Sequence, residues 1–279
     1  MKLKLKFNVL IAPLFGLSVL FGALSSSSSI AQTNERQSKA QAIFAERCKT
    51  AGTRISRTID NVEGIRVLKL RPERPNHSDQ FAMNDPYGRD LGGKLGYIGS
   101  FVRGEFQATH RGIPKEGSPP RLGYLYVEAQ DPEDGLWYRY TGSMKVTGRM
   151  DASAPNVQVD LKRNPNFDLN VYRFVLDRAP ATGQSPRYGV TYDDISTREE
   201  REYWIAGSSL KVVDLQTNEV IAERIGYMVD LAQGSKSGGR SPWLFAADNA
   251  CPKFSDRNGS GAQPYQALDF VEKVLRPAK

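Results

Sequence analysis

The sequence predicts a mainly β protein with a few peripheral helices, built from antiparallel sheets in a sandwich-like or barrel-like arrangement. Two observations favour this fold class, and a third favours a single domain. Short runs of alternating apolar and polar residues dominate the chain after residue 50. Residues that form turns separate these runs. No linker-like segment and no internal repeat divides the chain. An α+β fold is the alternative.

The first 31 residues have the order of a secretory signal peptide. Residues 1–6 carry three lysines and no acid, residues 7–24 are largely apolar, and small residues follow. Ser29 and Ala31 occupy the −3 and −1 positions of a cleavage site after Ala31. An uncleaved membrane anchor is the alternative, because the apolar run approaches the length of the shortest spanning helices. We therefore expect a single mature domain made of residues 32–279.

Removal of this segment changes the charge and the compartment that we expect. Because the segment holds three lysines and no acid, the formal net charge falls from +7 to +4. So small an excess does not predict nucleic-acid binding. No later apolar run approaches spanning length, so we expect no membrane span in the mature protein. The sequence predicts a periplasmic or extracellular protein whose partner is another envelope protein or polymer.

The chain has two cysteines, Cys48 and Cys251. An even number of cysteines in an exported chain favours one disulfide. This bond would join the two ends of the mature domain and would stabilise it by at most roughly 5 kcal/mol through loop-closure entropy. Two separate buried thiols are the alternative. The absence of Cys-x-x-Cys spacing argues against a redox-active pair.

Three segments have helical patterns. The first covers residues 34–51, with an apolar stripe made of Ala40, Ile43, Phe44 and Cys48. The second begins at Thr197, which has capping-box spacing with Glu200, and is expected to end near Ala206. The third opens at Pro264, with its apolar stripe at Leu268, Val271 and Leu275.

Strand patterns fill most of the remaining chain. The predicted strands cover residues 54–59, 65–70, 122–129, 136–147, 157–161, 171–177, 188–192, 210–215 and 220–229. Turn residues 130–135 predict a first hairpin, and Thr217-Asn218 predicts a second. Residues 71–96 are rich in Pro, Asn, Asp and Gly and indicate a long loop. Residues 97–109 are ambiguous.

Several short blocks carry a resemblance to known proteins. The blocks are Tyr203-Trp204-Ile205-Ala206-Gly207, Val212-Val213-Asp214-Leu215-Gln216-Thr217, Ile225-Gly226-Tyr227-Met228, Ser241-Pro242-Trp243-Leu244-Phe245-Ala246-Ala247 and Ala250-Cys251-Pro252. Together they resemble an uncharacterised family of exported proteobacterial proteins, mainly over residues 190–275. The resemblance implies export and a single domain. It implies no activity and transfers no functional residues.

Candidate catalytic residues are few. The sequence has two histidines, His77 and His110, and the catalytic residues are unknown. His77 stands beside Ser78 and Asp79, but triads are assembled from distant segments, so exposed loop histidines are the simpler reading. Ser208 and Lys211 form a Ser-x-x-Lys without its companion motifs.

Acidic residues offer a second type of site. Paired carboxylates can hydrolyse glycosides, and acids also suit the start of a helix. The acids concerned are Asp193, Asp194, Glu199, Glu200 and Glu202. The sequence predicts no cofactor, and no metal site, since the two cysteines are better used on each other.

The first hairpin offers a candidate binding face. If Gln130 faces Leu136 across the turn, then Tyr126 pairs with Tyr140. In that register four tyrosines share one face and suit stacking on sugars or contact with a protein: Tyr124, Tyr126, Tyr138 and Tyr140. Cover by a helix or a second sheet is the alternative, and a shift of one residue would separate the tyrosines.

The loop formed by residues 234–241 offers a second candidate. Its glycines free the backbone amides to curve around an anion, and Lys236 and Arg240 add positive charge. A phosphate, an anionic lipid head group or an acidic partner would fit such a loop. A solvated hairpin loop is the alternative.

These observations favour a non-enzymatic exported protein that binds another macromolecule. One version is an inhibitor or immunity-type protein that covers the site of a toxin or an envelope hydrolase. The alternative is an envelope hydrolase or carbohydrate-active enzyme that combines His77 or His110 with carboxylates.

Overall fold

A computed structural model describes residues 20–73, 79–81, 85–90, 92–105 and 122–279, with side chains from residue 34 onward. The predicted mainly β class is confirmed. A nine-stranded sheet has the order β1-β9-β8-β7-β3-β4-β5-β6, and β10 also pairs with β9. Its strands are β1 (Gly52–Ile55), β3 (Gly64–Val67), β4 (Tyr126–Gln130), β5 (Trp137–Arg149), β6 (Asn170–Pro180), β7 (Tyr188–Asp194), β8 (Ile205–Asp214), β9 (Glu219–Val229) and β10 (Ala250–Cys251).

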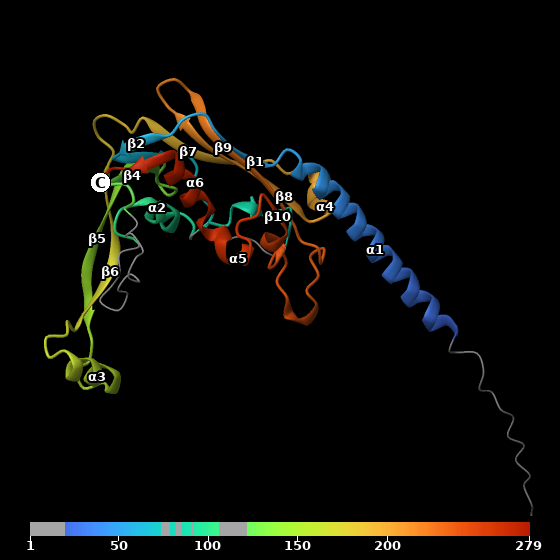
Figure 1. Ribbon diagram of the computed structural model, residues 1–279, viewed down its shortest axis with the longest axis horizontal. Helices are drawn as coiled ribbons and strands as arrows, with labels where there is room; N and C mark the ends of the chain where they lie inside the picture. The colour runs from blue at the N-terminus through green and yellow to red at the C-terminus, as the bar shows by residue number, and fades with distance from the viewer. Residues whose placement is uncertain (1–19, 74–78, 82–84, 91, 106–121) are drawn as a thin grey trace, which may run out of the picture.

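Most neighbouring strands are antiparallel, as predicted, but β3 is parallel to both β4 and β7. The long connection between β3 and β4 permits this crossover, since parallel strands cannot be joined by a tight turn. A small parallel pair, β2 (Ile59–Val62) with β11 (Leu275–Pro277), lies beside the large sheet. In Figure 1 the sheet forms an arch that is completed by the projecting β5–β6 arm.

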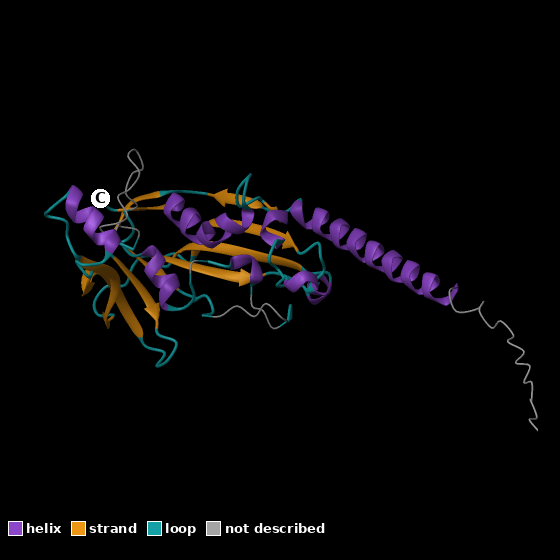
Figure 2. Ribbon diagram, turned by 90° about the horizontal axis from the view of Figure 1, so that it is seen from below, coloured by secondary structure: helices purple, strands orange, loops and turns teal. Residues whose placement is uncertain are grey.

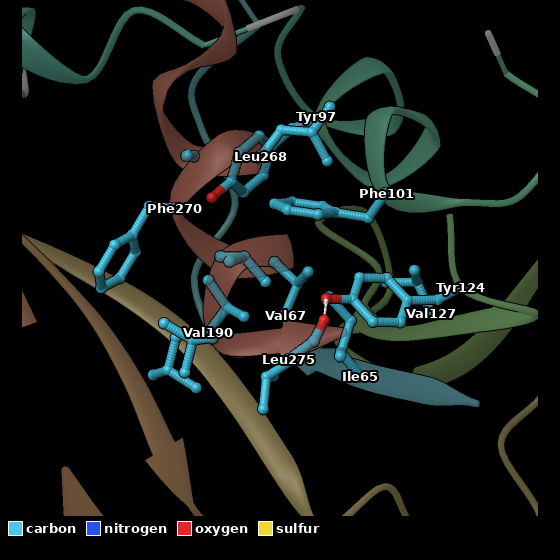
Figure 3. Packing of buried hydrophobic residues seen from close by; sticks show 14 of the residues in the cluster. Ile65, Val67, Tyr97, Phe101, Tyr124, Val127, Val190, Leu268, Phe270 and Leu275 are labelled. Carbon is cyan, nitrogen blue, oxygen red and sulfur yellow. Dashed lines mark hydrogen bonds between the residues drawn. The ribbon is translucent and has the colours of Figure 1, made fainter. Parts of the chain in front are cut away.

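The main core lies under the concave side of the arch, which we call the inner face. Helices α2 (Leu95–Phe101) and α6 (Gln266–Val274) cover it (Figures 1 and 2). The apolar stripe predicted for the last helix is buried: Leu268 and Val271 pack in the cluster shown in Figure 3, and Leu275 begins β11. Alternate residues of β3 and β4, including Ile65 and Val127, meet these helices.

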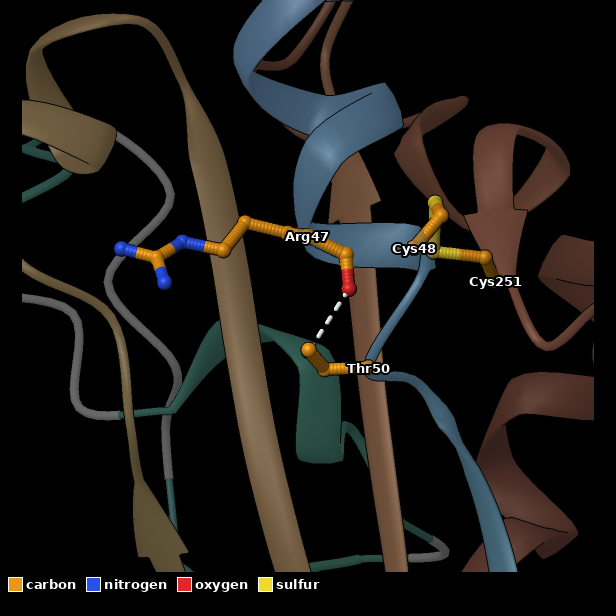
Figure 4. Close-up of a disulfide and its surroundings, with 4 residues drawn as sticks. All are labelled: Arg47, Cys48, Thr50 and Cys251. Carbon is orange, nitrogen blue, oxygen red and sulfur yellow. Dashed lines mark hydrogen bonds between the residues drawn. A yellow bond between two sulfur atoms is a disulfide. The ribbon is translucent and has the colours of Figure 1, made fainter.

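Helix α1 (Leu20–Cys48) packs on the opposite, outer face of the sheet. It begins earlier than the predicted residue 34 and passes through the predicted cleavage site. Its stripe contacts Ile205, Tyr227 and Val229, residues that alternate on the outer side of β8 and β9. The helix ends at the disulfide between Cys48 and Cys251, which confirms the predicted bond (Figure 4).

Helix α4 (Arg198–Glu202) has the capping box that the sequence predicted. The backbone N–H of Glu200 donates to Thr197 Oγ1 (3.2 Å), and the N–H of Thr197 donates to Glu200 Oε2 (2.6 Å). The helix is shorter than expected, because Trp204 has a left-handed φ of 54° and β8 starts at the next residue.

Residues 157–161 were predicted as a strand and form part of helix α3 (Pro155–Arg163) instead. Proline in the first turn favours a helix start, and the short alternating run fits either structure. α3 lies at the tip of the β5–β6 arm (Figure 1). Short helical segments complete the fold: Pro86–Gly88, Ser237–Gly239, Ala246–Asn249, α5 (Gly259–Ala262) and Gln263–Tyr265. Among the described helices, none has the length and apolar character needed to cross a bilayer.

Candidate functional site

The four tyrosines of the first hairpin do not share a face, so that prediction is wrong. Val127 faces Tyr140 and Ala129 faces Tyr138, one residue away from the expected register. Tyr138 and Tyr140 therefore lie on the inner face, where Tyr140 is buried. The turn causes the shift, because the N–H of Asp131 donates to the carbonyl of Leu136 (2.8 Å) and Gln130 then pairs with Trp137.

Tyr124 and Tyr126 are separated by an irregular backbone. The N–H groups of Leu125 (2.8 Å) and Tyr126 (3.4 Å) both donate to the carbonyl of Glu63. Leu125 and Tyr126 thus stand opposite the single residue Glu63, as in a β-bulge, and this changes the alternation of side chains between the two faces. Tyr124 is buried and its hydroxyl donates to the carbonyl of Leu275 (2.6 Å), as Figure 3 shows. Tyr126 alone stays on the outer face.

The glycine-rich loop surrounds a carboxylate of the chain itself. The backbone N–H groups of Ala232, Gly234 and Trp243 donate to the Asp230 carboxylate at 3.1–3.3 Å. Arg240 forms an ion pair with the same carboxylate. Of the amides in the predicted loop 234–241, that of Gly234 donates to Asp230, whereas those of Ser235, Gly239 and Arg240 donate to nearby backbone carbonyls. Lys236 is exposed on this loop.

A different cluster occupies the outer face, where β3, β4 and β5 lie side by side. We call it the Arg–aromatic cluster; it consists of Arg66, Tyr126, Glu128, Trp137 and Arg139. The guanidinium carbon of Arg139 lies 4.0 Å from the ring centroid of Tyr126, and that of Arg66 lies 3.9 Å from the ring centroid of Trp137. Both distances are typical of cation–π contacts.

Glu128 joins the two halves of the cluster. Its Oε1 accepts hydrogen bonds from Nη2 (2.7 Å) and Nε (3.1 Å) of Arg139, and its Oε2 lies 3.5 Å from Nη2 of Arg66. The Glu128 side chain is 1% exposed, whereas Arg66 and Arg139 are 23% and 32% exposed. Solvent therefore meets two guanidinium groups and two aromatic rings, while the balancing carboxylate is hidden.

Packing fixes the positions of these side chains. Gly64 stands opposite Tyr126, and a Cβ at Gly64 would lie 2.4 Å from the tyrosine ring. The absence of that Cβ lets the ring lie flat against β3. Arg139 Nη2 also donates to the carbonyl of Gln184 (3.2 Å), so its guanidinium is held from two sides. A cation held in this way loses little rotamer entropy when it binds a partner.

A hollow of about 240 Å³ adjoins the cluster. Its lining includes Arg139, Thr141, Asp177 and Thr182, from β5, β6 and the segment that follows β6. The hollow is open to solvent on the outer face, so a side chain of a partner can enter beside Arg139.

Sequence reasoning missed Arg66, Glu128, Trp137 and Arg139 as a group. Because the expected register was wrong by one residue, the predicted binding face included neither Trp137 nor Arg139. One signal was present in the sequence: Glu128 is a single acid between the apolar residues Val127 and Ala129 of a predicted strand. A buried carboxylate needs a cation nearby, and Arg139 on the next strand provides it.

A buried polar cluster lies on the inner face. Arg71 forms ion pairs with Asp85 and Asp90, and its guanidinium carbon lies 3.4 Å from the centroid of the Tyr192 ring. Burial raises the pKa of Asp90 to about 6, against the opposing effect of Arg71. Arg71 and Asp90 are almost fully buried, and the cluster connects Arg71, Asp85 and Asp90 to the sheet and to α6.

The Ser-x-x-Lys pair has no catalytic geometry. Ser208 Oγ donates to Asp85 (2.8 Å) on the inner face, whereas Lys211 donates to Asp193 (2.7 Å) on the outer face. A spacing of three residues on a strand places side chains on opposite faces. His77 and His110 lie outside the described residues.

Two of the acids near α4, Glu200 and Asp194, have structural partners. Glu200 closes the capping box and pairs with Arg47, and Asp194 accepts a hydrogen bond from the N–H of Asp85 (2.9 Å) and pairs with Arg201. In the described part of the chain, no three His, Cys, Asp or Glu side chains gather in an arrangement that could hold a metal ion.

In comparisons with known proteins, no family model, no curated protein and no solved structure matched the chain. The resemblance to exported proteobacterial proteins therefore stays a prediction.

Proposed function

We propose that this chain is an exported, non-enzymatic protein that binds a partner protein of the cell envelope through the Arg–aromatic cluster. The observation that carries the proposal is the pair of cation–π stacks held over the buried Glu128 on an uncovered part of the outer face. Tryptophan, tyrosine and arginine are the residues that contribute most to protein interfaces.

The charge of the cluster favours an acidic partner. Two arginines and one glutamate leave an excess of one positive charge, and the glutamate is out of reach of solvent. A carboxylate on the partner would meet Arg139 at the hollow and form a charge-assisted hydrogen bond there. An acidic loop that covers the cluster suits the inhibitor or immunity-type role.

Export is part of the proposal and has two supports. The disulfide between Cys48 and Cys251 is a bond that persists in oxidising compartments. The order of basic, apolar and small residues in the first 31 residues is that of a signal peptide. Cleavage after Ala31 would leave α1 with its docked half, because the contacts of Ala40, Ile43 and Phe44 lie beyond the cut.

Photo-cross-linking in the envelope of the native host tests the proposal. A photoreactive residue at Thr141, which lines the hollow, is compared with one at Phe245, which is exposed on a loop elsewhere. We expect a protein cross-linked at Thr141 only, through a segment rich in Asp or Glu. Arg139→Ala should remove the product, and Arg54→Ala, an exposed arginine of β1, should not.

Three results would overturn the proposal. They are cross-links that form equally at both positions, a product that survives Arg139→Ala, and an anionic polysaccharide in place of a protein at Thr141. The folding of Arg139→Ala is checked by circular dichroism. If that variant unfolds, Trp137→Phe, which keeps an aromatic ring, is used and should weaken the product.

A further inference from the structure

A second hollow, of about 190 Å³, lies on the inner side of the sheet, away from the Arg–aromatic cluster. It is bounded by β9, by α6 and by the segment that follows the disulfide. The lining residues on which its chemistry depends are Arg224, Phe254, Gln266, Asp269, Phe270 and Lys273. The hollow opens to solvent, so a small ligand can reach it.

Arg224 is the central group of this hollow. It lies on the inner face of β9 between Leu210 and Thr53 of the neighbouring strands, and it is half-buried. Its Nη1 donates to Gln266 Oε1 (2.6 Å). Within the described residues it forms no ion pair, unlike Arg66, Arg71 and Arg139. Guanidinium N–H groups therefore remain for a ligand.

Gln266 holds Arg224 in place. Its Nε2 donates to Asp90 (3.2 Å), and the Asp90 carboxylate is fixed by Arg71 and by the N–H of Ala267. Because the amide nitrogen of Gln266 faces Asp90, its oxygen must face Arg224. Gln266 is 6% exposed, so this chain of contacts is shielded from water. Arg224 is thus pre-positioned before a ligand arrives.

The rest of the lining combines positive charge with apolar walls. Lys273 is exposed at the rim and forms no ion pair with a described residue, whereas Asp269 has a partner of its own. The guanidinium carbon of Arg224 lies 5.1 Å from the ring centroid of Phe254. Phe270 projects from the side of α6 opposite to Phe101, as Figure 3 shows. A simple inorganic anion would make no use of two phenylalanine rings.

We propose that this hollow, the Arg224 pocket, binds a small carboxylic acid that carries an apolar group. The carboxylate pairs with Arg224, whose planar guanidinium suits two parallel hydrogen bonds, and Lys273 adds attraction at the rim. The apolar group contacts Phe254 and Phe270. The same chemistry is presented by a free acid and by the C-terminal residue of a peptide, and the experiment separates the two. The proposal does not depend on the outer face.

Titration of the full mature protein with defined probes tests the pocket. The probes are 3-phenylpropanoate as a free acid and N-acetyl-alanyl-phenylalanine as a peptide, each compared with its primary amide, and binding is followed by isothermal titration calorimetry and by shifts of backbone amide resonances. We expect saturable binding of at least one acid, with shifts at β9 and α6. Loss of the carboxylate in the amides should weaken binding at least about tenfold.

Matched variants assign the binding to these residues. Arg224→Gln should weaken binding at least about tenfold, and Lys273→Gln about twofold to threefold, as expected for a half-buried and an exposed charge. Arg54→Gln, on the neighbouring strand but facing outward, should leave binding unchanged. Because Arg224 also bonds to Gln266, folding of Arg224→Gln is checked by thermal unfolding. If it is lost, Phe254→Ala replaces this variant and should weaken both acids.

Some results of these titrations would identify the ligand, and others would overturn the proposal. Stronger binding of the peptide acid would identify a peptide C-terminus as the ligand, and stronger binding of 3-phenylpropanoate would identify a free acid. Amides that bind as tightly as acids, sulfate that binds as tightly as the acids, or no saturable binding of any probe would each overturn the proposal. None of these results bears on the photo-cross-linking at Thr141.

Discussion

The ion pair between Glu128 and Arg139 yields the most detailed prediction. Arg139→Ala removes two hydrogen bonds to a carboxylate that is 1% exposed and leaves it only Arg66, at 3.5 Å. Breaking a buried ion pair costs about 3–5 kcal/mol. Because Arg139 is 32% exposed, solvent screens part of this effect. We expect the free energy of unfolding to fall by about 3 kcal/mol.

Glu128→Gln removes the charge of the side chain but keeps its size, so it isolates the effect of the charge on stability. The amide keeps one acceptor for Arg139, so this variant alone should cost about 1–2 kcal/mol. In the Arg139→Ala background the same change should restore about 1–2 kcal/mol, because a neutral amide is cheaper to bury than an unpaired carboxylate. The two substitutions are therefore non-additive, with opposite signs of the Glu128→Gln effect in the two backgrounds.

Urea unfolding followed by circular dichroism measures all four members of this cycle. Arg54→Ala is the control; it is exposed and should change the free energy of unfolding by less than about 0.5 kcal/mol. If Glu128→Gln destabilises the Arg139→Ala variant as much as the wild type, then Glu128 is not held by Arg139 and the description of the cluster is wrong.

Three further predictions concern the scaffold. Replacing Cys48 and Cys251 with serine should lower the free energy of unfolding by up to about 5 kcal/mol under oxidising conditions, because the bond joins residues 203 positions apart; unchanged urea midpoints would contradict this. Gly226→Ala should destabilise the protein by about 2 kcal/mol or more, because the new Cβ would lie 1.9 Å from the hydroxyl oxygen of Tyr87. Gly148→Ala is the control in thermal unfolding and should be nearly neutral, because a Cβ at Gly148 would meet open space. Burial raises the pKa of Asp90 to about 6, so between about pH 4 and 6 the folded state binds a proton that the unfolded state has released. Protonation of Asp90 therefore stabilises the folded state fully below about pH 4, and this stabilisation is lost as the pH rises through 6. Asp90→Asn should flatten the dependence of the urea midpoint on pH in that window, and an unaltered slope would refute the assignment.

Local patterns predicted several elements correctly. The stripe of Ala40, Ile43 and Phe44 docks as expected, and Thr197 with Glu200 forms the expected capping box. The hairpin of β8 and β9 turns close to Asn218, which has a left-handed φ of 56°. Each of these features depends on residues that are close in the sequence, so a local sequence pattern can predict it.

Errors arose where distant or backbone contacts decide the outcome. The Asp131–Leu136 hydrogen bond set the register of β4 and β5, and the bulge at Glu63 turned Tyr124 inward. Neither contact has a periodic signature. The same single-residue shift hid the candidate site, because the positions of Trp137 and Arg139 on the outer face depend on it. Asp230, a residue outside the predicted anion loop, pairs with Arg240 and accepts a hydrogen bond from the Gly234 amide.

The central claim is that Arg139 and its cluster bind an acidic envelope protein. The most direct measurement is the dissociation constant between this protein and the purified partner that cross-links at Thr141. The charge of Arg139 and that of the partner's cross-linked carboxylate are exchanged, first singly and then together. Arg139→Glu should raise the dissociation constant at least about 30-fold, as for an interface hot spot. Replacement of that carboxylate by lysine in the partner should then restore much of the affinity for Arg139→Glu. Equal affinity of wild type and Arg139→Glu for the unmodified partner would contradict the account.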